Sequence, residues 1–517
     1  MLSGLIELTI NEILRKYYGY EKFRPGQEDI ISRIISGQDI CAVMPTGAGK
    51  SLCYQIPALA LPGITLVISP LISLMQDQVR ILKAAGISAA YINSSLTPAQ
   101  IGLALQRAAA GAYKIIYVAP ERLESGSFIS FARKSDISVI AVDEAHCISL
   151  WGHDFRPSYC RIADFTDKLS RRPVVASFTA TANRRVRDDI INKLRLKEPY
   201  IVTTGYDRPN LYFGVASPVC DGFADPKLEF IKSYIEAHRD ENGIIYCNTK
   251  KQTEGVAEEL RRNGFIAEAY HAGMDSTARR RIQEDFTFGR TPVIAATSAF
   301  GMGIDKPDVR FVIHYSMPQR LEEYYQEAGR AGRDGEKAEC ILLYSYPDYL
   351  FLRDYFILRK DGKESNPDMT PQQYQEYTDA RLSELYRMKR YASSKNRCLR
   401  QQLLDYFGEK SNSCCFNCSC CKNDILLHIA PKKNNEDYDI GLFHSLKAKA
   451  AMLSIRTGVP VFAIADDRIL KELASQKPVT EAELRRIPGF TPVKLRHYGQ
   501  DFIRTIKEYY KGNIPKV

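Results

Sequence analysis

The stretch PTGAGKS, residues 45–51, follows the apolar run ICAVM and is expected to open a helix. A strand, a glycine-containing loop and a helix in this order predict a phosphate-binding loop. Glycines allow backbone N–H groups to close around phosphate oxygens, and the helix N-terminus adds positive potential. We expect Lys50 to reach the β- and γ-phosphates and Ser51 to bind Mg²⁺, with Thr46, Gly47 and Gly49 in the loop. The alternative is a glycine turn without a ligand, because Met44 replaces the first glycine of the strict pattern.

Short β-branched runs alternate with helical stretches on both sides of this loop. Continuous apolar runs of this length predict strands buried on both faces, and their alternation with helices predicts a parallel, doubly wound α/β sheet. The pattern restarts near residue 243, so two α/β units are expected in tandem. The runs are ICAVMP (40–45), TLVISP (65–70), IIYVAP (115–120), SVIAVDEAH (138–146) and VVASFTATA (174–182), then GIIYCNT (243–249), IAEAYHAG (266–273), PVIAATSAF (292–300) and FVIHYSMP (311–318).

The run VIAVDEAH, residues 139–146, ends in two carboxylates. Asp143 at the tip of the strand is expected to hold Mg²⁺ directly or through water, and Glu144 to polarise the attacking water. A solvated acidic strand end would be the simpler interpretation of this motif alone. Together with the phosphate loop, in this order along the chain, it predicts a nucleoside triphosphatase.

In the second unit, QEAGRAGRDG (326–335) places Arg330 and Arg333 on a glycine-spaced segment. Arginine offers a planar, permanently charged fork that suits a γ-phosphate. One of the two is expected to act as an arginine finger for the nucleotide. Taken alone, the segment would be interpreted as a surface helix.

The net charge and the apolar runs indicate which classes of binding partner are compatible with the sequence. The 517 residues include 71 Lys+Arg and 61 Asp+Glu, a net charge of +10. This mild excess is compatible with nucleic acid, although a basic metabolic enzyme would share it. No run of about 18 apolar residues occurs, so we expect neither a membrane span nor a membrane partner.

Six of the thirteen cysteines lie within residues 398–421. This crowding predicts a metal before disulfides, and four thiolates make a closed, structural zinc site. One distant ligand and two C-x-x-C steps are provided by Cys398, Cys415, Cys418 and Cys421. Rival sets that use Cys414 or Cys420 stay open.

Together, PTGAGKS, DEAH (143–146), TATA (179–182) and QEAGRAGRDG resemble superfamily 2 helicases. Three further stretches resemble the RecQ family. They are Tyr20 with FRPGQ (23–27), WGHDFRP (151–157) and AFGMGIDKP (299–307). The resemblance implies two tandem RecA-like domains and an ATP-dependent DNA helicase, a hydrolase, that translocates 3′ to 5′ on single-stranded DNA. Unwinding of duplexes in DNA recombination and repair is the implied function.

The resemblance also implies cofactors and nucleotide contacts. ATP, Mg²⁺ and Zn²⁺ are expected, with the zinc on the four cysteines of the C-x-x-C set. The resemblance assigns adenine recognition to Tyr20, Arg24 and Gln27. Their aromatic ring, guanidinium group and amide suit a purine. Of the two arginines, Arg333 is the better finger candidate and Arg330 is expected to couple the site to DNA.

Residues 151–157 are implied to sense single-stranded DNA through Trp151, Phe155 and Arg156. Stacking of a tryptophan on a base is worth about 1–3 kcal/mol. The alternative is a tryptophan packed into the core beneath a loop. Gly301, Gly303 and Asp305 are expected to line the nucleotide site or to sense DNA.

The resemblance divides the chain into five parts. They are 1–205 (ATP-binding RecA-like domain), 206–343 (second RecA-like domain), 344–425 (helical zinc module), 426–440 (linker) and 441–517 (a small all-α HRDC domain). The HRDC domain is expected to assist DNA binding, with Lys494 and Arg496 near phosphates; a purely protein-binding bundle is the alternative. Family members commonly carry a winged helix of around a hundred residues before it, which cannot fit here.

The expected partners are single-stranded and partly duplex DNA. DNA-repair and single-strand-binding proteins are the candidate protein partners, and a monomer is expected. The expected compartment is the cytoplasm, associated with the nucleoid, in a prokaryote and the nucleus in a eukaryote. A binding scaffold with a vestigial ATPase is the alternative from another class, and it is disfavoured by the intact Lys50, Asp143, Glu144, Arg330 and Arg333.

Overall fold

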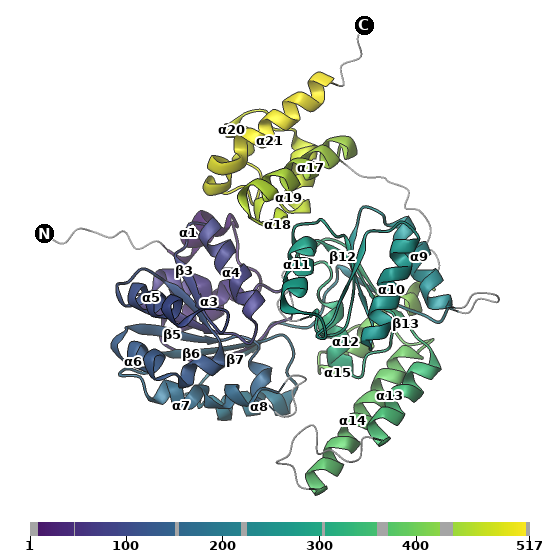
Figure 1. Cartoon of the computed structure of the whole chain (residues 1–517), viewed down its shortest axis with the longest axis horizontal. Helices are drawn as coiled ribbons and strands as arrows, with labels where there is room; N and C mark the ends of the chain where they lie inside the picture. Colours follow the sequence, from purple (N-terminus) through teal and green to yellow (C-terminus); the bar gives the residue numbers. More distant parts are fainter. Residues whose placement is uncertain are drawn as a thin grey trace, which may run out of the picture. The chain divides into compact units, whose positions relative to one another are not determined.

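The structure is a computed structural model that describes residues 9–45, 47–149, 155–218, 225–301, 306–358, 371–423 and 438–512. Thr46, Trp151, Gly303 and Asp305 lie outside these ranges. Within them, no helix combines the length and the apolar character needed to cross a bilayer. Two parallel sheets and a C-terminal group of helices account for the ordered elements (Figure 1).

The first sheet has seven parallel strands in the order β3-β4-β2-β5-β6-β1-β7. Their bounds are β1 Ile40–Val43, β2 Ile64–Ile68, β3 Ala89–Ile92, β4 Ile115–Val118, β5 Ile137–Val142, β6 Val174–Thr179 and β7 Tyr200–Thr203. Five of these are the strands expected from the apolar runs. The expectation missed β3 and β7, the two edge strands, whose half-exposed residues do not form a continuous apolar run.

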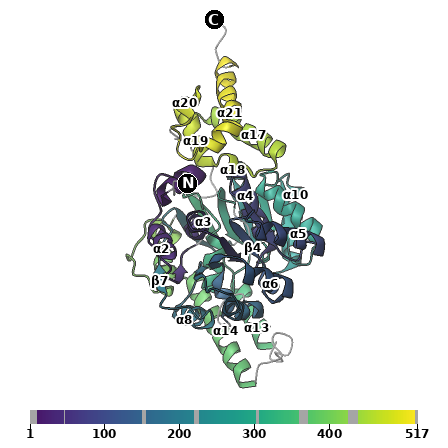
Figure 2. The ribbon, with the colours of Figure 1, turned by 90° about the vertical axis from the view of Figure 1, so that its left-hand side faces the viewer.

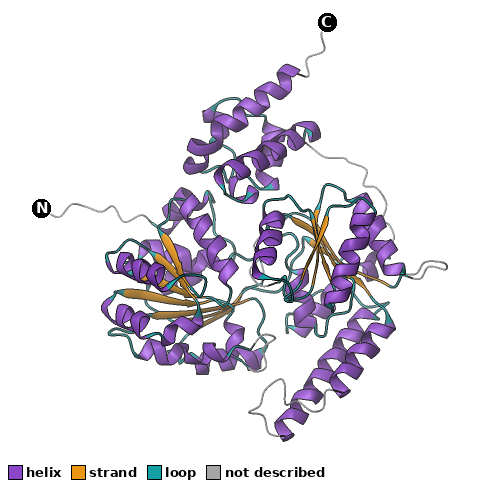
Figure 3. Ribbon diagram, in the orientation of Figure 1, coloured by secondary structure: helices purple, strands orange, loops and turns teal. Residues whose placement is uncertain are grey.

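Helices cover both faces of this sheet (Figure 3). Side chains of α2, α3 and α4 pack in one core cluster, and those of α5, α6, α7 and α8 pack in another on the opposite face. The N-terminal elements are α1 Ile10–Ile13, a π-helical turn Leu14–Tyr18, α2 Gln27–Ile35, α3 Lys50–Ala60 and α4 Ile72–Ala84. The others are α5 Pro98–Ala109, α6 Gly126–Lys134, α7 Ile162–Asp167 and α8 Arg184–Lys193.

The second sheet has six parallel strands in the order β10-β11-β9-β12-β13-β8. They are β8 Leu211–Ala216, β9 Asn242–Tyr246, β10 Ala267–Tyr270, β11 Val293–Ala296, β12 Val309–His314 and β13 Ala338–Leu343. The four expected runs became β9 to β12, whereas β8 and β13 were missed. The helices are α9 Pro226–Ala237, α10 Lys250–Arg262, α11 Ser276–Thr287 and α12 Leu321–Ala328.

Four more helices belong to the same compact unit as the second sheet. They are α13 Tyr346–Leu358, α14 Pro371–Ala392, α15 Leu399–Tyr406 and α16 Ser419–Lys422. Figures 1 and 2 show α13 and α14 side by side. The sequence predicted a helical module from residue 344, and its first helix, α13, is mostly apolar. Both α15 and α16 contact β8, so the cysteine segment is built onto an edge of the sheet.

The C-terminal helices form a bundle with its own core cluster. They are α17 Ile440–Thr457, α18 Val461–Ile464, α19 Asp467–Gln476, α20 Glu481–Leu484 and α21 Pro492–Gly512. Asp439 and Asp466 cap α17 and α19 by accepting backbone N–H bonds at 2.9 and 2.8 Å. Only 17 residues separate the end of α16 from the start of α17, so the sequence argument against a winged helix holds.

A substitution of Gly243 in β9 would test how closely the strands of the second sheet pack. A Cβ there would lie 2.0 Å from the Phe311 ring on the neighbouring strand β12. We expect Gly243→Ala to lower the free energy of unfolding by about 3 kcal/mol, because overpacking forces backbone shifts. Chemical denaturation measures this.

Gly255 in α10 is the matched control, since a Cβ there meets no atom within 4 Å. Gly255→Ala should stabilise the protein by about 0.5–1 kcal/mol, because glycine is a poor helix former. Equal effects of the two substitutions would contradict the packing of β9 against β12.

Candidate functional site

The phosphate loop connects β1 to α3. Gly47 and Gly49 have φ values of 83° and 81°, which favour glycine. Lys50 is the first residue of α3, and its Nζ donates to the Met44 carbonyl oxygen at 3.1 Å. The ammonium group therefore lies over the loop that would hold the phosphates. Ser51 follows in the first turn of α3.

The segment before α2 holds this loop in shape. The Gln27 amide donates to the carbonyl oxygens of Ala48 at 3.0 Å and of Gly49 at 3.1 Å, and its own oxygen accepts the Arg24 N–H at 2.9 Å. The Arg24 guanidinium donates to the Gly47 carbonyl. Gln27 is buried, whereas Tyr20 is 45% exposed. The sequence assigned these side chains to adenine, and that role stays a prediction; sequence reasoning missed their contacts with the loop.

The acidic residues lie at the carboxyl end of β5. Asp143 is 8% exposed, and its carboxylate accepts the Glu144 backbone N–H at 3.0 Å. The Tyr159 hydroxyl donates to the Asp143 carbonyl at 2.9 Å. Glu144 adopts the left-handed conformation with φ 47°, which is uncommon for a residue other than glycine. Such a conformation at a strand end is typical of functional sites.

Strand β6 lies between β1 and β5, so it joins the two motifs. The Thr179 carbonyl accepts the Met44 N–H at 2.9 Å, next to the phosphate loop. On the other side, His146 Nδ1 lies 2.9 Å from Thr179 Oγ1 and 3.3 Å from Glu144 Oε2. Sequence reasoning gave His146 and Thr179 no individual role. The only signal was their membership of DEAH and TATA.

Two of the three residues assigned to single-stranded DNA are described. The Phe155 ring lies 5.8 Å from Lys193 Nζ, and Arg156 Nη1 donates to the Pro70 carbonyl at 3.1 Å. The Arg156 N–H also bonds to the Cys147 carbonyl at 2.8 Å. These contacts anchor the segment that follows residues 150–154 to α8 and to the loops after β2 and β5.

In the second unit, the two arginines follow α12 and differ in burial. Arg330 is 5% exposed, and a Cβ on Gly301 would lie 2.8 Å from its Nη2. Arg333 is half-buried. This difference favours Arg333 as the residue available to a nucleotide, and it makes Arg330 a packed part of the second unit.

A buried pair lies one turn before these arginines. Glu327 Oε2 and His314 Nε2 are 2.9 Å apart, and both residues are buried. Burial raises the pKa of Glu327 to about 8, with Arg330 opposing the shift, and burial lowers the pKa of His314 to about 3. Near neutral pH the pair is therefore largely uncharged, and a neutral hydrogen bond joins β12 to α12.

This pair predicts a pH-dependent stability. The unfolded chain releases the Glu327 proton above its ordinary pKa of 4.5, whereas the folded protein keeps it up to about pH 8. Glu327 therefore lowers the free energy of unfolding as pH rises through this window. Glu327→Gln stays neutral in both states. We expect the melting temperature of the variant, relative to the parent, to increase from about pH 5 to about pH 8.

The control is Glu258→Gln on α10, an exposed carboxylate paired with Arg262 at 2.5 Å. It should not reproduce the trend. A difference for Glu327→Gln that is constant with pH would contradict a neutral buried Glu327.

The structure brings the four predicted zinc ligands together. The sulfur atoms of Cys398, Cys415, Cys418 and Cys421 all lie within 4.8 Å of one another. A tetrahedral zinc with bonds of 2.3 Å needs sulfur atoms about 3.8 Å apart, so this donor set fits zinc. Burial raises the pKa of Cys418 to about 11. Burial would also raise that of Cys421, but hydrogen bonds from neighbouring thiols and the Cys415 backbone lower it to about 6.

The two remaining cysteines are placed differently. Cys420 Sγ is directed at the Ser394 carbonyl at 3.4 Å, away from the cluster. Cys414 lies beside Cys421, where its hydrogen bond helps to stabilise the thiolate. The geometry thus favours the C-x-x-C set over the rival sets that use Cys420.

Removal of one ligand tests this site. Cys418→Ala should lose zinc and lower the melting temperature strongly, because binding of a structural metal adds to folding free energy. Metal analysis should find about one zinc per chain in the parent protein. Cys420→Ala is the matched control and should keep the metal. Retention of zinc by Cys418→Ala and its loss by Cys420→Ala would refute the assignment.

The C-terminal bundle changes one expectation. Burial lowers the pKa of Lys494, and the Asp466 carboxylate at the start of α19 opposes this shift. Lys494 is half-buried, whereas Arg496 is exposed. Of the two, Arg496 is the better candidate for a phosphate contact.

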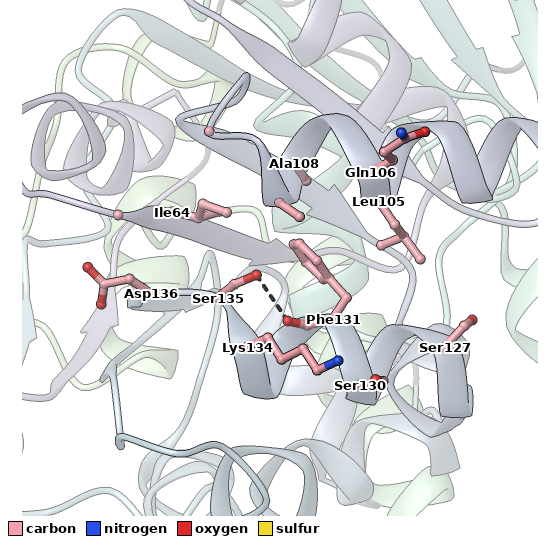
Figure 4. Close-up of a pocket in the computed structure, with 13 residues that line it drawn as sticks. Ile64, Leu105, Gln106, Ala108, Ser127, Ser130, Phe131, Lys134, Ser135 and Asp136 are labelled. Carbon is pink, nitrogen blue, oxygen red and sulfur yellow. Dashed lines mark hydrogen bonds between the residues drawn. The ribbon is translucent and has the colours of Figure 1, made fainter.

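A pocket of about 440 Å³ lies elsewhere on the first unit (Figure 4). It is lined by α5, α6 and the residues that precede β2 and β5, including Phe131, Lys134 and Asp136. Ligands of open α/β sheets bind at the carboxyl ends of the strands, where the phosphate loop lies. This pocket is at the amino ends and is not part of the nucleotide site.

Comparison with known proteins places these features in a family. Four family models match: DEAD/DEAH box helicase over residues 24–190, helicase conserved C-terminal domain over 226–335, RecQ zinc-binding over 353–422 and HRDC domain over 439–506. Among solved structures, the Mycobacterium smegmatis helicase Lhr bound to single-stranded DNA and AMP-PNP has a TM-score of 0.54 at 20% identity. The match covers 66% of this chain and 48% of that one, and it supports the fold alone.

Curated relatives are closer. The ATP-dependent DNA helicase RecQ of Bacillus subtilis is 43% identical over 599 aligned positions, which include 96% of this chain and 98% of the relative. The RecQ helicase of Haemophilus influenzae is 42% identical over 422 positions, 81% of this chain and 65% of that protein. At this identity and coverage, together with the paired sheets, the nucleotide motifs and the four-cysteine cluster, the chain belongs to the RecQ family of DNA helicases.

Proposed function

We propose that this protein is an ATP-dependent DNA helicase that translocates 3′ to 5′ on single-stranded DNA and unwinds duplexes in recombination and repair. The observation that carries the proposal is the connection through β6. Met44 beside the phosphate loop and His146 beside Glu144 both bond to Thr179. Three hydrogen-bonded residues, Met44, Thr179 and His146, therefore join the phosphate loop to the acidic strand end.

Each charged group of the nucleotide site has one role in the proposed hydrolysis of ATP. Lys50 exchanges the Met44 carbonyl for phosphate oxygens, which gives it a better partner for its charge. Glu144 orients the attacking water and accepts its proton, with His146 fixing the carboxylate. Mg²⁺, when bound with ATP, adds charge neutralisation, and Ser51 and Asp143 are the residues that would hold it. Arg333 stabilises charge in the transition state.

DNA is bound mainly through its backbone. The segment after DEAH, with Trp151, Phe155 and Arg156, supplies base stacking and a cation. The C-terminal bundle contributes 13 Lys+Arg against 8 Asp+Glu over residues 438–512, an excess of five that equals half of the net charge of the chain. Affinity should therefore fall steeply with salt.

This chain lacks a segment that a relative has. The alignment with the B. subtilis protein has 599 positions, but only 96% of the 517 residues here enter it. Roughly 100 positions of that relative thus have no counterpart in this chain. A winged helix of that size is absent between α16 and α17, so duplex contacts must come from the zinc module and the bundle. We further propose that the protein acts as a monomer. DNA-repair proteins are its proposed partners, in the compartment that holds the DNA.

ATPase and strand-separation assays test this function. Lys50→Ala should reduce DNA-stimulated hydrolysis about 100-fold or more, because its charge faces the phosphates, and leave the melting temperature unchanged. Lys83→Ala, an exposed lysine of α4, is the matched control and should keep full activity.

The parent should unwind a short duplex with a 3′ single-stranded tail and fail on a blunt duplex at the same salt. Melting one base-pair step costs on the order of 1–2 kcal/mol, so the motor must first load on a single strand. Hydrolysis and translocation without strand separation would identify a translocase instead. Equal stimulation by RNA would contradict the DNA assignment.

A further inference from the structure

The first residues of the second unit, 206–211, are held from two sides. On one side lies the turn that carries Arg330 and Arg333. The Arg208 guanidinium donates to three carbonyl oxygens of this turn, those of Gly329 at 3.4 Å, Ala331 at 3.0 Å and Gly332 at 2.7 Å. The arginine-bearing turn is thus shaped by contacts with a segment more than 100 residues earlier in the chain.

Asn210 completes this side. Its amide donates to the carbonyl oxygens of Gly332 and Glu336, both at 2.9 Å, and its oxygen accepts from Arg208 Nε at 3.3 Å. Gly332 has a φ of 55°, and a Cβ there would lie 2.6 Å from the Asn210 amide nitrogen. The turn therefore requires glycine next to Asn210, and its conformation depends on the position of residues 208–210.

The zinc module holds the same segment from the other side. Arg400 Nη1 donates to the Asp207 carboxylate and to the Arg208 carbonyl oxygen, both at 2.6 Å, and Nη2 donates to the Leu211 carbonyl. Its guanidinium lies 5.5 Å from the Phe213 ring. Arg400 is 6% exposed and its bond to the Leu211 carbonyl oxygen is buried, whereas the Asp207 side chain is exposed.

Further contacts of the cysteine segment reach the same place. The Asn417 amide donates to the carbonyl oxygens of Pro209 at 3.2 Å and Leu211 at 3.1 Å. The Tyr206 ring stacks on Phe407 at 4.3 Å. Arg400 is in the first turn of α15, whose N-cap is the zinc ligand Cys398. The zinc cluster therefore fixes the start of the helix that holds residues 207–211.

We propose that Arg400 and Arg208 are positioning residues for ATP hydrolysis, which act through Arg333. Arg400 joins the zinc module to residues 207–211, and Arg208 joins these residues to the turn that ends in Arg333. The proposal rests on the proposed ATPase function. It gives the zinc module a role in ATP hydrolysis in addition to stability and duplex contacts.

The chemistry requires arginine at both positions. Arg208 donates hydrogen bonds to three carbonyl oxygens and one amide oxygen. Arg400 donates to one carboxylate and two carbonyl oxygens. A guanidinium offers five donors in a rigid plane, whereas a lysine ammonium is a single rotatable point. Lysine preserves the charge and loses the geometry, so Arg→Lys separates the two effects.

The test uses Arg208→Lys and Arg400→Lys in the full-length, zinc-loaded protein. We expect each to lower DNA-stimulated kcat about 10- to 100-fold, the cost of a misplacement of about 1 Å at a catalytic group. KM for ATP should stay within about twofold, because only transition-state contacts are lost. Zinc content should stay at that of the parent, which shows that the effect does not come from metal loss.

A double substitution distinguishes positioning from general structural damage. If Arg208 acts through Arg333, then Arg333→Ala removes its target, and Arg208→Lys in that background should not lower the residual kcat further. Independent effects would multiply instead. Multiplied effects in the double variant would overturn the proposal, as would a normal kcat for Arg208→Lys.

The control is Arg172→Lys in the first unit. Arg172 pairs with Asp39 and donates to the carbonyl oxygens of Pro173 at 3.3 Å and Arg195 at 3.4 Å, so it makes the same kinds of contact away from the turn. It should lower the melting temperature and leave kcat within about twofold. A parent protein that does not hydrolyse ATP would refute the proposed function, whereas an active parent with normal arginine variants would refute this inference alone.

Discussion

The parallel pairing of β1, β6 and β5 is the constraint on which the nucleotide site depends. Parallel strands present their carboxyl ends at one edge, so the loop after β1 and the acidic residues after β5 meet on either side of Thr179. Burial on both faces of the sheet leaves the three strands no freedom to slip in register. Lys50 and Asp143, 93 positions apart in the chain, therefore become parts of one site.

The shape of the nucleotide site is also maintained by side chains that are not expected to contribute charge to nucleotide binding. The Gln27 amide donates hydrogen bonds to the carbonyl oxygens of the phosphate loop, and His146 connects the DEAH motif to β6. A glycine loop has little conformational preference of its own. Preorganised hydrogen bonds from buried side chains supply the shape that it lacks, and this avoids reorganisation during hydrolysis.

In the second unit the corresponding task falls to Arg208 and Arg400. Residues 206–211 form a short segment with a turn at Pro209 and Asn210, where the Leu211 N–H bonds to the Arg208 carbonyl oxygen at 3.0 Å. Their position follows from a clamp formed by α15 on one side and by the end of α12 on the other. The zinc ligand Cys398 lies two residues from Arg400, and Arg400 holds the segment that carries Arg208.

The sequence by itself determined the fold class, the tandem units, nine of the thirteen strands in the part of the chain that the structure describes, and the four cysteines that the structure brings together. These depend on local patterns: buried β-branched runs, glycine loops and cysteine spacing, which are set within a few neighbouring residues. It missed β3, β7 and β8, which are edge strands, and β13, whose apolar run is interrupted by Glu339. Only the tertiary structure decided that Gln27 binds the phosphate loop and that Arg400 and Arg208 form a clamp. Each of these contacts joins residues separated by some 20 to 190 positions, and such pairings arise from packing rather than from any local pattern.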